Sequence, residues 1–79
     1  MNLNVLYFAA LAEAAGRDGE TISTRAADLR ALYAERAAEH GFDWPVEHLR
    51  VALDGAFVSW DSPPRDGAEV VFIPPVSGG

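Results

Sequence analysis

Cysteine is absent from this 79-residue sequence, and so is lysine. Without cysteine the chain has no disulfide to stabilise its fold and no thiolate to bind a metal or act as a nucleophile. Its basic residues are six arginines, set against twelve acidic residues, and the net charge is −6. This shortage of positive charge argues against nucleic acid, whose phosphates require clustered lysine and arginine. It is consistent with a basic partner, and equally with solubility alone.

Long apolar runs are also missing. The N-terminal stretch MNLNVLYFAALAEAAG has no basic start, and Glu13 interrupts it, so that it matches neither a signal peptide nor a membrane span. We therefore expect a cytoplasmic protein that does not bind membranes. A chain of this length forms one domain, residues 1–79, and with 49% hydrophobic residues it should fold around a modest core. Such a core leaves little room for a deep catalytic pocket.

The periodicity of the chain predicts strands, one short helix and one long helix. Alternation and turn residues predict strands at 2–8, 19–25, 49–53, 56–60 and 69–73. A short helix at 9–15 should end at Gly16, and a long helix should run from an N-cap at Thr24 to Gly41. Asp54 and Gly55 supply the positive φ angles of a tight hairpin turn.

This order of elements indicates an α+β fold. Strands that surround one principal helix predict a β-grasp, or ubiquitin-like, roll, with a mixed sheet of about five strands and the helix across one face. A ferredoxin-like fold is the main alternative. It requires a second long helix after the third strand, and residues 54–79 offer none.

The sequence is poor in catalytic motifs. It has no G-x-S-x-G turn and no glycine-rich loop that opens a helix after a strand. His40 and His48 are the only histidines and have no third ligand near them, so we expect no metal site, and His40 should simply end the long helix. The remaining candidates for acid–base chemistry are expected to be solvated surface carboxylates: Glu13, Glu35, Glu39, Asp43 and Glu47.

Three apolar residues fall on the outward phase of predicted strands. Phe8, Phe57 and Ile73 point away from the side that carries Tyr7 and Phe72, which are expected in the core. If this outer face is uncovered, it carries a contiguous apolar patch of the kind that marks an interface. The alternative is that a loop or the short helix covers it.

The C-terminal residues 74–79 form a predicted tail with an unusual composition. The final strand leads into Pro74 and Pro75, which hold the chain extended, and then into Val76 and Ser77. Gly78 and Gly79 have no Cβ, so that this backbone can enter a channel too narrow for side chains. Six extended residues reach roughly 20 Å, which suits delivery of the terminal carboxylate into another protein's active site.

The chain resembles the small, sulfur-carrying subunit of molybdopterin synthase, a ubiquitin-like β-grasp family. The resemblance covers nearly the whole length. It rests on VLYFAALAEAAG near the start, on the Asp-Gly pair, and above all on VSWDSPPRDGAEVVFIPPVSGG at the end.

The resemblance implies a role without catalysis of its own. An adenylating, E1-like enzyme would use ATP to activate Gly79, a sulfur donor would convert the acyl-adenylate to a thiocarboxylate, and no cofactor would bind this chain directly. The large synthase subunit would accept the tail and transfer the sulfur to a pterin precursor. The family precedent for that complex is a heterotetramer. The chain would then be the sulfur-donating, non-catalytic subunit of a transferase.

The family's functional positions map onto this sequence with few departures. Its outward apolar docking residues match Phe8, Phe57 and Ile73, and its tail matches residues 74–79 throughout, ending in the reactive Gly79. Many members carry an arginine where this chain has Ala12. The residues usually found around the D-G-D-E turn are replaced by Pro64 and Ala68.

Other functions share this tail and fold. A sulfur carrier of the thiamine pathway uses the same terminus, although it usually lacks the two prolines. A ubiquitin-like modifier would join Gly79 to lysines of target proteins, and an interaction module would not use its tail at all. The fold alone does not separate these alternatives.

Overall fold

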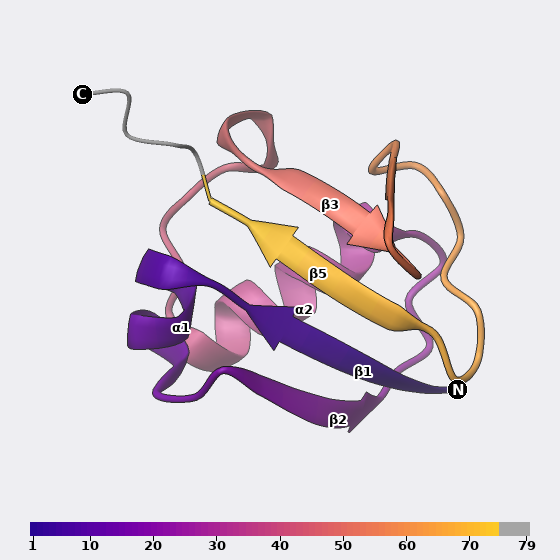
Figure 1. Ribbon diagram of the computed structural model, residues 1–79, viewed down its shortest axis with the longest axis horizontal. Helices are drawn as coiled ribbons and strands as arrows, with labels where there is room; N and C mark the ends of the chain where they lie inside the picture. Colours follow the sequence, from indigo (N-terminus) through magenta and orange to yellow (C-terminus); the bar gives the residue numbers. More distant parts are fainter. Residues whose placement is uncertain (75–79) are drawn as a thin grey trace.

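The computed structural model of the chain describes residues 1–74, and it shows a five-stranded mixed sheet with its main helix against one face (Figure 1). In chain order the elements are β1 (Asn2–Tyr7), α1 (Ala9–Ala15), β2 (Gly19–Ser23), α2 (Leu29–His40), a 3₁₀ turn (Val46–His48), β3 (Arg50–Leu53), β4 (Ala56–Val58) and β5 (Glu69–Ile73). The sheet order is β2-β1-β5-β3-β4. Strands β1 and β5 are parallel, and the other neighbours are antiparallel.

This arrangement confirms the β-grasp prediction. Helix α2 lies behind the sheet in the view of Figure 1, and no second long helix follows β3 within the described residues. The ferredoxin-like alternative is therefore wrong. The hairpin predicted between β3 and β4 is also observed, with positive φ angles of 49° at Asp54 and 88° at Gly55.

The core lies between the sheet and α2 and is rich in aromatic rings. Phe72 on β5 is fully buried, and its ring centroid lies 5.3 Å from that of Tyr33 and 5.8 Å from that of Trp60. Tyr7 stacks on the same ring at 6.3 Å. The predicted core positions of Tyr7 and Phe72 are confirmed. Aromatic side chains contribute large buried areas, which a small domain needs.

The start of α2 differs from the prediction. Asp28 is the N-cap, and its Oδ1 accepts a hydrogen bond of 2.8 Å from the Ala31 amide. Thr24, the predicted cap, is instead buried in the segment before the helix, where its hydroxyl accepts from the Ala26 amide and donates to Glu35. The prediction was wrong because both residue types can cap a helix, and only tertiary contacts decide between them.

Both helices end at the glycines that the sequence predicted. Gly41 follows α2 in the left-handed conformation with φ 76°, and its amide donates to Ala37. Gly16 closes α1 in the same way, with φ 74°. Glycine is the residue that adopts this conformation without strain. The two helix ends were therefore predictable from single residues.

Candidate functional site

One face of the sheet is not covered by a helix, and apolar side chains form a row across it. Leu6 on β1 pairs with Val71 on β5, Val71 pairs with Ala52 on β3, and Ala52 pairs with Phe57 on β4. Directly paired residues point to the same side of a sheet, so these four side chains are neighbours on the face opposite α2. The row therefore crosses four of the five strands.

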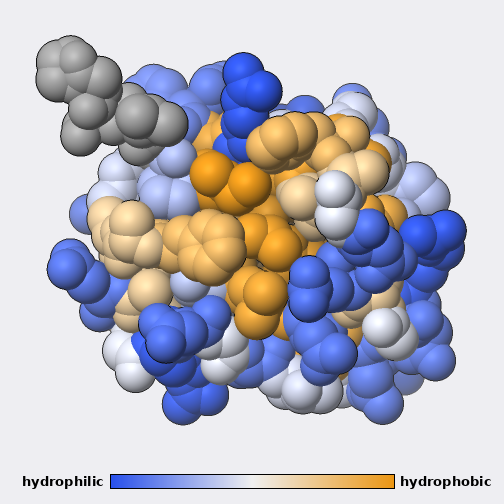
Figure 2. All heavy atoms as spheres, in the orientation of Figure 1, coloured by the Kyte–Doolittle hydropathy of each residue, from blue (hydrophilic) through white to orange (hydrophobic). Residues whose placement is uncertain are grey.

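Two further residues extend this row into a patch. Phe8 continues β1 in extended conformation, and Ile73 ends β5 two residues after Val71, so each shares the phase of the row. We call the whole set the apolar face; it consists of Leu6, Phe8, Ala52, Phe57, Val71 and Ile73. Figure 2 shows apolar side chains gathered over the middle of the uncovered side, with polar residues around them.

The aromatic rings of the apolar face are open to solvent, whereas its central residues are buried. The exposed fraction is 51% for Phe8 and 64% for Phe57, whereas Val71 in the central strand is 8% exposed. Neither the short helix nor a loop within residues 1–74 covers these rings, which settles the alternative left open by the sequence. Exposed phenyl rings of this kind are typical of interfaces. The binding role of Phe8, Phe57 and Ile73 itself stays a prediction.

An arginine that the sequence pattern did not single out lies beside this patch. Arg50 pairs with Ile73 across β3 and β5, and its guanidinium carbon lies 5.7 Å from the centroid of the Phe57 ring. A cation over an aromatic face is held by the ring quadrupole. The apolar face therefore has one positive charge next to the point where β5 ends.

The tail begins beside Arg50, at the point where β5 ends. Ile73 is the last residue of β5, and Pro74 follows it as the last described residue. The other predicted tail residues, namely Pro75, Val76, Ser77, Gly78 and Gly79, lie outside the described residues. Their predicted roles stay predictions. The described part places the start of the tail beside Ile73, within the apolar face.

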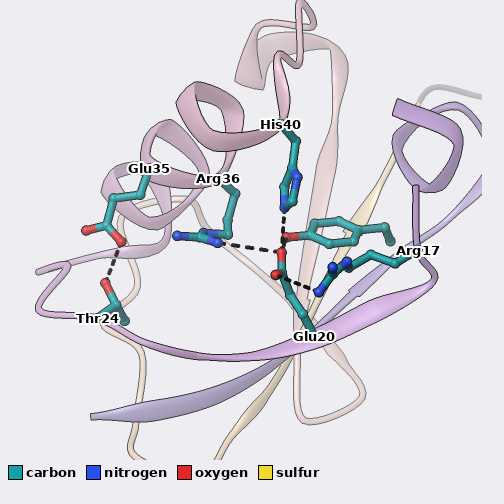
Figure 3. Close-up of polar contacts among 7 residues, drawn as sticks. Arg17, Glu20, Thr24, Glu35, Arg36 and His40 are labelled. Atoms are coloured by element: carbon teal, nitrogen blue, oxygen red, sulfur yellow. Dashed lines mark hydrogen bonds and ion pairs between the residues drawn. The ribbon is translucent and has the colours of Figure 1, made fainter. Parts of the chain in front are cut away.

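A cluster of polar side chains lies on the opposite side of the sheet, and sequence reasoning missed it. Glu20 on β2 accepts hydrogen bonds at its Oε2 from the Tyr7 hydroxyl at 2.5 Å and from His40 at 2.6 Å. Arg36 and Arg17 each approach the same carboxylate to 3.5 Å (Figure 3). Glu20, Arg36 and His40 are each less than one fifth exposed. We call Glu20 and the four residues that contact its carboxylate, namely Tyr7, Arg17, Arg36 and His40, the Glu20 cluster.

The Glu20 cluster keeps its carboxylate charged. Burial alone would raise the pKa of Glu20, but the hydrogen bonds from Tyr7 and His40, with the positive charge of Arg36, outweigh it and lower that pKa. Burial, together with the neighbouring carboxylate, raises the pKa of Tyr7 above its usual range. Every donor aimed at Glu20 is thus matched by an ionised acceptor, and the cluster ties α2 to β1 and β2 rather than presenting a reactive group.

The described residues contain neither a candidate metal site nor a candidate membrane span. No group of three His, Asp or Glu side chains within residues 1–74 could hold a metal ion. His40 ends α2 as predicted, and its ring is bound to Glu20. In the same range, no helix has the length and apolar character needed to cross a bilayer.

The positions at which the sequence departs from the family pattern have structural roles. Pro64 and Ala68 are buried; Ala68 directly precedes β5, and its carbonyl accepts from the Asn4 amide at 3.0 Å. Ala12 packs against the core from α1. These three side chains therefore contribute packing, and none of them lies on the apolar face.

Comparison with known proteins gives the same fold and a family. The sulfur carrier subunit of molybdopterin synthase from Escherichia coli strain K12 is 35% identical, over 98% of this chain and 99% of its own. A solved structure from Pyrococcus furiosus, described as a putative molybdopterin converting factor subunit 1, is 30% identical with a TM-score of 0.78, over 96% of this chain and 99% of that one.

A third relative is part of a complex. The solved complex of subunits 1 and 2 of the molybdopterin-converting factor from Helicobacter pylori contains a chain that is 25% identical, with a TM-score of 0.69 and full coverage of both chains. The element order and the mixed five-stranded sheet define a ubiquitin-like protein of the β-grasp class. Residues 5–79 match the ThiS family, and the chain belongs to that family. The resemblance drawn from the sequence is confirmed.

Proposed function

We propose that this protein is a sulfur carrier in molybdopterin biosynthesis. One observation carries the proposal: the similarity to the sulfur carrier subunit from Escherichia coli extends over almost the whole of both chains. The ThiS family match reaches Gly79, the residue to which the proposal assigns the chemistry. No group of side chains within residues 1–74 could hold a metal ion, which is consistent with a protein that others act upon.

The proposed chemistry follows from the state of a terminal carboxylate. An α-carboxyl group has a pKa of about 3.5 and is ionised at pH 7, which makes it a poor electrophile. An adenylating partner would transfer AMP from ATP to the Gly79 carboxylate and release pyrophosphate. Sulfide, supplied by a donor, would then attack the carbonyl carbon and displace AMP, which leaves a thiocarboxylate. Gly78, having no side chain, would let this group pass into a narrow active site.

The apolar face is the proposed docking surface for both partners. A large synthase subunit that covers Phe8, Phe57 and Ile73 would remove exposed apolar area from water, at about 25 cal/mol per Å². The residues from Pro74 through Ser77 would span the distance from this surface to the partner's active site. The Helicobacter pylori complex of subunits 1 and 2 gives a precedent for such a pair.

Mass spectrometry of the intact protein tests the proposal. The chain is co-expressed with a sulfur donor and with an adenylating enzyme that activates carriers of this family. It should then gain the mass expected when sulfur replaces one oxygen. A variant that lacks Gly79 should gain nothing. An unmodified wild-type terminus, under conditions in which a known carrier is converted, would contradict the proposal.

The pathway is tested by delivery of the sulfur. The thiocarboxylated protein, mixed with a large synthase subunit and the cyclic pterin precursor, should return to its carboxylate form as the dithiolene product appears. Loading without delivery would indicate a sulfur carrier for another pathway, such as that of thiamine.

A further inference from the structure

A shallow groove runs over the uncovered side of the sheet, next to the apolar face. It lies over β1, β2 and the start of β5, and its outward side chains are Leu6, Thr21, Asn4 and Glu69. Gly19 pairs with Leu6 and leaves this part of β2 without a side chain. A Cβ at Gly19 would lie only 2.8 Å from Leu6 Cδ2 and 2.9 Å from the Val5 carbonyl oxygen. The groove therefore exists because Leu6 lies over a glycine.

The groove is apolar at one end and acidic at the other. Leu6 belongs both to the groove and to the apolar row, so the two surfaces are continuous. At the other end, Asn4 Oδ1 accepts a hydrogen bond of 2.8 Å from the Thr21 hydroxyl. Glu69 stands beside Asn4 on the neighbouring strand, and within residues 1–74 its carboxylate makes no hydrogen bond or ion pair. This end thus offers oxygen acceptors and one uncompensated negative charge.

We propose that the groove receives an arginine side chain of the protein that docks on the apolar face. The existence of that partner rests on the function proposed above. The aliphatic part of an arginine would lie on Leu6 and Gly19, and its guanidinium would donate to the Glu69 carboxylate. A charge-assisted pair of this kind is stronger than a neutral hydrogen bond.

Charge selects a basic side chain over an acidic or an apolar one. The protein carries a net charge of −6, so a basic group is attracted to it at long range. An acidic or phosphate-bearing group would meet Glu69 directly. A purely apolar group would bury that carboxylate without a partner, which is costly. The site therefore gives the docking surface a preferred orientation, because its charged end lies on one side of the apolar row only.

The first test uses the isolated protein and needs no partner. N-acetyl-arginine amide is titrated into the labelled protein at low salt, and the amide shifts are followed by NMR. We expect shifts centred on Leu6, Gly19 and Thr21, and none with the citrulline analogue, which has the same shape without charge. Glu69→Gln should abolish the arginine response. Equal responses to both probes, or none, would overturn the proposal.

The second test uses the complex. Affinity for a large synthase subunit is measured for wild type, Glu69→Gln and Glu47→Gln; Glu47 is an exposed carboxylate on the 3₁₀ turn, outside the groove. We expect Glu69→Gln to weaken binding about threefold to tenfold, with a reduced dependence on salt, while Glu47→Gln has little effect. Equal effects of both variants would overturn the groove and leave the proposed function intact. Failure of the wild type to bind would count against the proposed function, and the arginine titration would then decide the groove by itself.

Discussion

Glu20 joins parts of the chain that are far apart in sequence. Its carboxylate accepts from Tyr7 at the end of β1 and from His40 at the end of α2, and it lies near Arg36 one turn earlier in that helix. Removal of the charge would leave these partly buried donors without a full acceptor. An unmatched polar group in such a place costs more than the bond itself contributes.

We expect Glu20→Gln to lower the free energy of unfolding by about 2 kcal/mol at pH 7, because hydrogen bonds to a charged acceptor are lost. Urea denaturation followed by circular dichroism measures this change. The matched control is Glu39→Gln, which removes the same charge from an exposed position on α2 and should change stability by less than about 0.5 kcal/mol. Equal losses in the two variants would contradict the assigned role of Glu20.

The effect of Glu20 should depend on pH in a defined direction. Its pKa is lowered in the folded protein, so its contribution is fully present above the unfolded-state pKa and is lost as the pH falls through the folded pKa. The stability difference between wild type and Glu20→Gln should therefore shrink in acid. A stability difference between the two proteins that stays constant from pH 7 down to the pH at which they unfold would contradict this account.

At the level of elements, the start of α2 shows how a helix terminus is satisfied by distant chain. The amides of Leu29 and Arg30 donate to the carbonyls of Ser62 and Trp60, and the next amide, that of Ala31, donates to the Asp28 side chain. The first amides of a helix have no partner within it. Here a loop near residue 60 supplies two of the acceptors and fixes where the helix begins.

We expect Asp28→Ala to destabilise the protein by about 1 kcal/mol, since the N-cap acceptor is lost. Asp28→Asn keeps a capping oxygen and serves as the control, with a change of only a few tenths of a kcal/mol, about the difference between the two caps. Thermal unfolding of the three proteins at one pH makes the comparison. An Asn variant as unstable as the Ala variant would show that charge, and not capping, matters at this position.

The sequence predicted those elements whose signals are local. The alternation in β1 and β5, the glycines after both helices and the Asp54-Gly55 turn each depend on neighbouring residues, and each was found. The cap at Asp28 was missed because threonine is also a favoured N-cap residue, so the local sequence does not distinguish Thr24 from Asp28. In the structure the Thr24 hydroxyl is hydrogen-bonded to the Ala26 amide and to the Glu35 carboxylate.

The candidate site divides in the same way. The outward phase of Phe8 and Phe57 follows from strand periodicity and was predicted. The stacking of Arg50 on Phe57 and the groove at Gly19 depend on strand order, because they join residues of β3 with β4 and of β1 with β2. The Glu20 cluster depends on the packing of α2 against the sheet. No pattern along the chain contains that information.

For the whole molecule, the two faces of the sheet differ in what they contact. One face packs against α2 and holds the aromatic core, whereas the other is uncovered and leads into the tail at Ile73 (Figure 1). Changes on the uncovered face should therefore affect partners more than folding. Phe57 is the sharpest place to test this, because it is 64% exposed.

We expect Phe57→Asp to weaken binding to a large synthase subunit by at least about tenfold, because a carboxylate would be forced into an apolar contact. Its thermal unfolding should stay close to that of the wild type, since the ring contributes little to the core. Ala34→Asp adds the same charge to an exposed position on α2, opposite the apolar face, and should leave the affinity nearly unchanged. If calorimetry finds the same affinity for both variants, Phe57 is not part of the docking surface. The partner would then not lie over the apolar face.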